Sequence, residues 1–158
     1  MKKQLEVAII KANSATFQDC ELYWLLSRTQ LEFVLKELEI FSSSPFVATA
    51  KYQEAMLPVI NLEKYYGLEE KEDKGPAKYY IIRSVNEKKE LVKLIVETPE
   101  SPKIQKLETD FTSFPSLLLP QNSANVLGMY SLQAGKIAVV PDFIGMTQSL
   151  HWRENKEL

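Results

Sequence analysis

The feature that most constrains this chain is its regular division into short apolar segments, each about one strand long. They recur roughly every 8–12 residues with turn residues between them. The clearest are Leu5–Lys11, Glu21–Leu26, Met56–Leu62, Tyr79–Val85 and Leu91–Val96. This pattern favours a mostly β fold of the sandwich or barrel type.

Other segments are less definite. Thr29–Phe41 fits both helical spacing and strand alternation, which short apolar runs do not separate. Val126–Leu132 and Lys136–Val140 are expected to form a hairpin, because the intervening QAG ends on a glycine that can take positive φ. Pro141–Leu150 is expected to contain one or two helical turns.

The charged stretch Glu69–Pro76 is the best candidate for a connection within the chain. We expect it to divide the chain, near residues 68–77, into two similar halves. Each half is long enough to curl into a small barrel. The 158 residues are the size of one ordinary domain.

Charge and composition argue against several classes of protein. The formal net charge is -2, without the excess of Lys and Arg that is usual in nucleic-acid binders. The single cysteine, Cys20, excludes an internal disulfide and fits the reducing cytoplasm. No apolar run approaches the roughly 20 residues that span a bilayer, and MKKQLEVAII is too short and interrupted for a signal peptide.

Motifs of catalysis and cofactor binding are missing from the sequence. There is no GxGxxG or P-loop pattern, and one His and one Cys are too few for a typical metal site. No nucleophile, base and acid form a recognisable set. We therefore expect a binding protein without cofactor or metal rather than an enzyme.

The stretch LPVINLEKYYGL, which starts at Leu57, resembles the segment "iPVvDLrkrlGl" of CheW-like domains. In that family the proline opens a strand, and the Asp-Leu position begins a short helical turn that a glycine closes. The corresponding residues here are Pro58, Asn61, Leu62 and Gly67. Proline is tolerated as the first residue of a strand.

Further pieces extend the resemblance over about residues 3–150, in the family's order and spacing. Gln30–Phe33 resembles the "VrEI" motif, and Pro45–Val47 resembles "P-x-F/Y-v". Tyr80–Val85 with Leu91–Glu97 is similar to the hairpin "vVvv…vGlvVD". Residues 126–143 are similar to the family's last hairpin.

The resemblance implies a fold and a function. The fold is mostly β, with two small five-stranded barrels of the SH3/OB type, short helical turns, and an N-terminal strand shared with the second half. The function is that of a non-catalytic cytoplasmic adaptor in chemotaxis. It couples the cytoplasmic tip of methyl-accepting chemoreceptors to the regulatory domain of a CheA-type histidine kinase, without inserting into the membrane.

The resemblance also implies which residues lie at the partner surface. These are Gln30, Leu31, Glu32, Phe33, Ala48, Gln53 and Glu54. Gln53 and Glu54 stand where the family's "LRG" motif has arginine and glycine, Ala48 stands near the glycine that opens this motif, and Lys93 replaces the glycine of "vGlvVD". For some of these residues an alternative remains open. Leu31 and Phe33 would be core residues instead, and Gln53 and Glu54 would be ordinary exposed strand residues.

Two other functions also remain open. The departures from the motif suit an adaptor that serves another two-component pathway. A small-molecule-binding or enzymatic β-domain would instead need its aromatic residues to line a pocket. The aromatic candidates are Tyr23, Trp24, Tyr65, Tyr66, Tyr79, Tyr80 and Trp152.

Overall fold

The computed structural model describes residues 4–14, 16–41, 48–72, 75–108, 118–133 and 135–156. The elements are β1 (Gln4–Lys11), β2 (Glu21–Ser27), η1 (Arg28–Gln30), β3 (Leu31–Leu35), β4 (Ile40–Phe41), β5 (Ala48–Tyr52), β6 (Ala55–Ile60), α1 (Leu62–Tyr65), β7 (Lys78–Val85), β8 (Leu91–Thr98), β9 (Pro102–Glu108), η2 (Ser123–Asn125), β10 (Val126–Gln133), β11 (Lys136–Pro141) and α2 (Phe143–Lys156). The mostly β prediction is confirmed. The ambiguous segment becomes β3 and β4, and the last helix is longer than expected. Pro45–Val47 lies outside the described residues.

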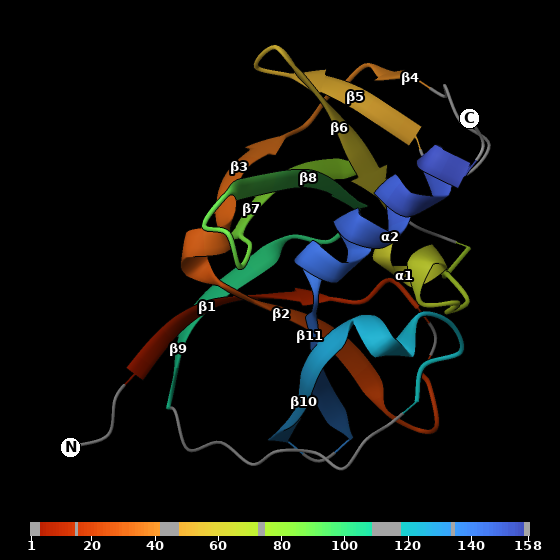
Figure 1. Cartoon of the computed structure of the whole chain (residues 1–158). Coiled ribbons are helices and arrows are strands. Elements are labelled where there is room, and N and C mark those ends of the chain that lie inside the picture. The colour runs from red at the N-terminus through yellow and green to blue at the C-terminus, as the bar shows by residue number, and fades with distance from the viewer. Residues whose placement is uncertain are drawn as a thin grey trace.

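The strands form two sheets, which lie above and below one another in Figure 1 with α1 and α2 at their junction. The first has five strands in the order β10-β11-β2-β1-β9, and the second has six in the order β3-β7-β8-β6-β5-β4. Both are mixed, because β11 runs parallel to β2 and β6 runs parallel to β8.

The charged stretch after α1 falls between two strands of one sheet, and the division of the chain near residues 68–77 stays a prediction. The stretch leads from β6 to β7, which belong to the same six-stranded sheet. The N-terminal strand β1 instead pairs with β9, from the second half of the chain. Long-range pairing of β1 and β2 with the C-terminal strands therefore decides which strands share a sheet.

The central strands bury both faces, which explains why their sequences are runs of apolar residues rather than strict alternations. In β7, Tyr80 and Ile82 join the large cluster between the sheets, whereas Ile81 joins a smaller cluster on the opposite face. In β1, Ala8 and Ile10 face the large cluster, and Val7 and Ile9 face away from it.

Side chains, rather than backbone hydrogen bonds, bring the edges of each sheet together. The strand orders are linear, so the described edge strands do not pair to close the expected barrels. In the first sheet, Leu107 of β9 and Tyr130 and Leu132 of β10 pack on one cluster. In the second, β4 is only two residues long, too short to form a closing ladder with β3.

The helical turn expected after Pro58 is present as α1. Asn61 caps it by accepting a hydrogen bond from the backbone N–H of Lys64 at 3.1 Å. Gly67 follows with φ of 75°, a conformation that favours glycine. Leu62 and Tyr66 enter the core between the sheets, and Tyr66 stacks on Trp24 with ring centroids 5.5 Å apart.

Glu63 of α1 ties this helix to the first sheet. Its side chain is only 1% exposed, and its Oε1 accepts hydrogen bonds from the Asn13 backbone N–H at 2.6 Å and from Trp24 Nε1–H at 3.2 Å. Burial raises the pKa of this carboxyl, against the lowering effect of the two hydrogen bonds.

Candidate functional site

Gln30 lies where the chain passes from the first sheet to the second. Its Oε1 accepts a hydrogen bond from the Ser27 backbone N–H at 3.0 Å, at the end of β2. Its Nε2 donates to Ser84 Oγ at 2.9 Å, in β7. The side chain therefore links the two sheets.

Leu31, Glu32 and Phe33 open the edge strand β3 and have different surroundings. Leu31 is partly buried and packs on the core between the sheets. Phe33 is 54% exposed. Of these two apolar residues, Leu31 therefore packs on the core and Phe33 does not. Leu31 pairs with Ile82 and Phe33 pairs with Ile81, so Glu32 has no partner of its own on β7. Glu32 is therefore the extra residue of a β-bulge.

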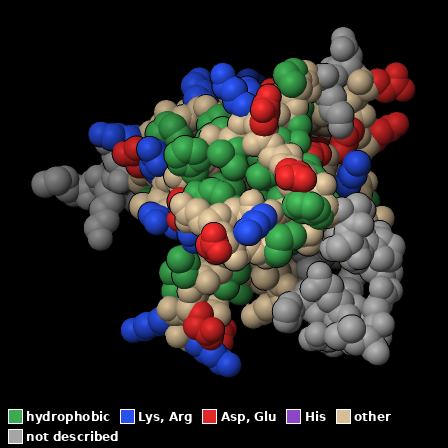
Figure 2. All heavy atoms as spheres, turned by 90° about the horizontal axis from the view of Figure 1, so that it is seen from above, with side chains coloured by type: hydrophobic (Ala, Val, Ile, Leu, Met, Phe, Trp, Pro, Cys, Tyr) green, Lys and Arg blue, Asp and Glu red, His purple; other side chains and the backbone are tan. Residues whose placement is uncertain are grey.

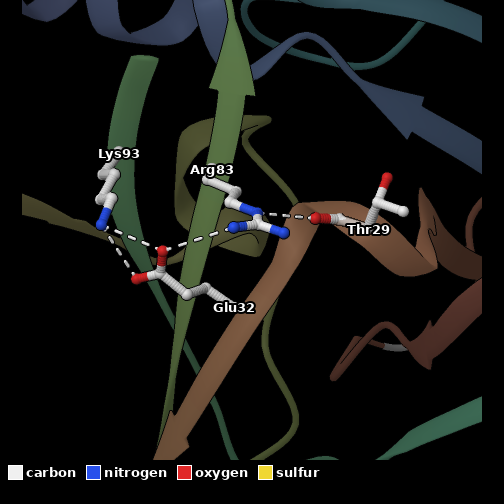
Figure 3. A network of polar contacts seen from close by, with 4 residues as sticks. All are labelled: Thr29, Glu32, Arg83 and Lys93. Carbon is white, nitrogen blue, oxygen red and sulfur yellow. Dashed lines mark hydrogen bonds and ion pairs between the residues drawn. The ribbon is translucent and has the colours of Figure 1, made fainter.

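Glu32 is held by two cations from neighbouring strands (Figure 3). Its Oε1 lies 3.0 Å from Lys93 Nζ and 3.9 Å from Arg83 Nη1, and its Oε2 accepts a hydrogen bond from Lys93 at 3.1 Å. Arg83 Nε also donates to the Thr29 backbone oxygen at 2.9 Å. The network fixes the start of β3 against β7 and β8.

Gln53 and Glu54 form the tip of the β5–β6 hairpin, so they are turn residues rather than strand residues. Both have positive φ, 48° and 71°, as in a type I′ turn. The family's glycine position therefore coincides with a left-handed residue. The turn connects to the Glu32 network through Tyr52, whose ring centroid lies 5.9 Å from Lys93 Nζ.

Ala48 is not close to this turn. It begins β5, where it pairs with Val59, and the turn follows the other end of the same strand. The distance along the strand from Ala48 to Tyr52 is roughly 13 Å. Gln30–Phe33 and the turn thus flank one polar network, while Ala48 stands apart from it.

A groove of about 580 Å³ runs between the two sheets beside this network. Val85 and Leu91 line it from the second sheet, and Leu127, Phe143 and Ile144 line it from β10 and α2. Gln30, Arg83 and Asp142 add polar groups. Arg83 therefore belongs both to the groove and to the Glu32 network.

Exposed apolar side chains also gather on the second sheet. Figure 2 shows hydrophobic side chains across the middle of the face seen from above, with acidic and basic side chains around them. The exposed apolar residues of this sheet include Phe33 and Val34 on the edge strand β3, Ile40 and Phe41 on the opposite edge strand β4, and Met56 on the inner strand β6. Large apolar residues rimmed by polar ones are typical of protein-interaction surfaces.

The sequence interpretation missed the cations and the groove. Arg83 was visible only as a polar residue of a predicted hairpin, and Lys93 only as the residue that replaces a family glycine. The pairing of Lys93 with Glu32 joins residues that lie 61 positions apart in the sequence. Val85 and Leu91 flank the turn of that hairpin. Their alternation predicted strands but carried no signal of which surface they would line.

The aromatic candidates for a ligand pocket lie elsewhere. Trp24, Tyr66 and Tyr80 are fully buried in the core, and burial raises the pKa of Tyr80 to about 12. None of the six aromatic candidates whose side chains the structure describes lines the groove. The side chain of Trp152 lies outside the described residues.

Two absences hold for the described part of the chain. No group of three or more of its His, Cys, Asp or Glu residues is placed to hold a metal ion. None of its helices is long and apolar enough to cross a membrane.

The comparisons with known proteins bear on the fold. The sequence matches no protein-family model and no curated protein. Among solved structures, the chain is similar to the scaffolding protein TtCheW from Thermoanaerobacter tengcongensis, with a TM-score of 0.63 and 13% identity. The match covers 89% of this chain and 86% of that one. The fold is CheW-like.

Proposed function

We propose that this chain is a non-catalytic adaptor that couples chemoreceptors to a CheA-type histidine kinase in the cytoplasm. The observation that carries the proposal is the groove between the two sheets of a CheW-like fold. An apolar groove of this kind suits an amphipathic helix, which is the form of a chemoreceptor's coiled-coil tip.

The second partner surface is the edge of the six-stranded sheet. The exposed edge strand β3, with Phe33 outward, suits another β-barrel domain, such as the regulatory domain of the kinase. Groove and edge adjoin at Gln30 and Arg83, so one small protein can hold both partners close together.

The groove is tested by binding of a purified chemoreceptor cytoplasmic tip from the same organism. Leu127→Glu places a charge on the groove wall at a residue that is 68% exposed, so the fold is kept. We expect at least about a tenfold loss of affinity. The matched control is Leu118→Glu, at an exposed leucine that does not line the groove. Equal binding by the two variants would argue against the groove.

A second candidate is an adaptor in a different receptor–kinase pathway. It is favoured by Gln53 and Glu54, since the turn lacks the arginine of the family motif. Titration against the regulatory domains of several kinases from one organism separates the two candidates. Preference for a kinase outside chemotaxis would support the second.

A further inference from the structure

The β-bulge at Glu32 determines how β3 presents its side chains. An extra residue in an edge strand bends the strand and re-aims the side chain beside it. Here that side chain is Phe33, which points outward although its register partner Ile81 is completely buried. Among the described strands, β3 pairs with β7 alone, so backbone hydrogen bonds to these strands hold it on one side.

Glu32 supplies the missing restraint through Lys93. Lys93 and Arg83 stand directly opposite each other on β8 and β7, an arrangement in which like charges repel. The carboxylate of Glu32 lies within 4 Å of both and offsets this repulsion. The side chains of Glu32 and Lys93 are 20% and 24% exposed, so solvent screens their pair less than a fully exposed one.

Lys93 also lies close to the β5–β6 turn, because its Nζ is near the ring of Tyr52. The turn residues Gln53 and Glu54 bring no positive charge of their own. The cation beside Tyr52 comes from β8 instead. One lysine therefore contacts both Glu32 of β3 and Tyr52, the residue that directly precedes the β5–β6 turn.

We propose that Lys93 is a positioning residue that, through Glu32, fixes the bulge of β3 and holds Phe33 outward for the partner that docks on this edge. The positioning step is a property of the free protein. Its effect on affinity rests on the proposed adaptor function.

Hydrogen exchange of the free protein tests the positioning step. Lys93→Gln should speed exchange of the β3 amides at least about fivefold, while the amides of β2 keep their wild-type rates. Lys93→Arg retains a cation and should restore most of the protection. Lys51→Gln, which removes an exposed lysine of β5 in the same sheet, is the matched control and should leave β3 unchanged. Unchanged β3 exchange in Lys93→Gln, or equal acceleration throughout the molecule, would overturn the proposal.

Binding to the kinase regulatory domain tests the consequence. If Lys93 acts through Phe33, the double variant Lys93→Gln/Phe33→Ala should bind no more weakly than Phe33→Ala alone. Additive losses would overturn the link between Lys93 and Phe33. Absence of binding by the wild-type protein would count against the adaptor function, while the exchange result would still decide the positioning step.

Discussion

Two glutamates hold neighbouring segments of the chain together, but with different partners. Glu63 lies at the junction of the two sheets, and Glu32 lies at the edge of the second sheet. Glu63 is buried and accepts two N–H hydrogen bonds, and no ion pair to it occurs within the described residues. Glu32 is partly exposed and lies between two cations. The junction thus depends on buried hydrogen bonds, and the edge depends on partly exposed charges that salt can screen.

The largest expected effect is at the junction. Glu63→Ala removes the acceptor for the Asn13 N–H and the Trp24 indole N–H, which stay buried. The free energy of unfolding should fall by about 3 kcal/mol, measured by urea denaturation. Glu54→Ala, at the exposed turn, is the control and should change it by less than about 0.5 kcal/mol. A loss below about 1 kcal/mol for Glu63→Ala would remove the proposed difference between the regions.

The pH dependence of stability sharpens the same contrast. Because burial raises the pKa of Glu63 above 4.5, the folded chain holds this proton more tightly than the unfolded chain. The contribution of this raised pKa to the free energy of unfolding is complete below pH 4.5. It is lost as the pH rises through the pKa of Glu63 in the folded chain. Glu63→Gln keeps an acceptor oxygen but does not titrate. The wild-type stability should therefore decline relative to this variant over that range, in thermal unfolding at several pH values. Parallel curves would contradict the assignment.

A smaller effect is expected at the edge. Glu32→Gln should lower the free energy of unfolding by about 1 kcal/mol, because the pair is only partly buried. The loss should shrink in 1 M NaCl, where the screening length is about 3 Å. Urea, which is uncharged, is the suitable denaturant. A loss that is independent of salt would mean that Glu32 acts like Glu63, through hydrogen bonding.

The smallest expected effect is a gain at the hairpin turn. Glu54 has φ of 71°, which glycine adopts without the strain of a side chain. Glu54→Gly should raise the free energy of unfolding by about 0.5 kcal/mol or slightly more. Gln133→Gly, near a turn that already contains Gly135 at positive φ, provides a contrast and should not stabilise. Destabilisation by Glu54→Gly would show that its side chain stabilises the turn.

Local patterns predicted much of the fold. The β7–β8 hairpin followed from two apolar runs around a polar turn, and the turn after Pro58 followed from the resemblance of one twelve-residue stretch. The arrangement of strands in the two sheets could not be predicted in this way. The parallel pairs β6–β8 and β11–β2 join segments that are distant in the sequence. No local rule specifies such pairings.

The candidate site was predictable only in part. The resemblance selected Glu32 and the β5–β6 turn and marked Lys93 as the replacement of a family glycine. It gave no sign that Lys93 reaches Glu32 across the sheet. The role of Glu63 could not be predicted either, because its local sequence gives no sign of burial. It lies in the polar segment EKYY, where a glutamate looks like an ordinary surface residue until the β1–β2 loop packs over it.

An adaptor must hold two partners at once, and one measurement tests this directly. A chemoreceptor cytoplasmic tip is immobilised, and retention of the CheA-type regulatory domain is measured with and without the purified chain. The account predicts retention only when the chain is present, with loss of retention for Leu127→Glu and for Phe33→Ala. Retention that does not depend on the chain, or none when the chain is present at saturating concentration, would contradict the adaptor function.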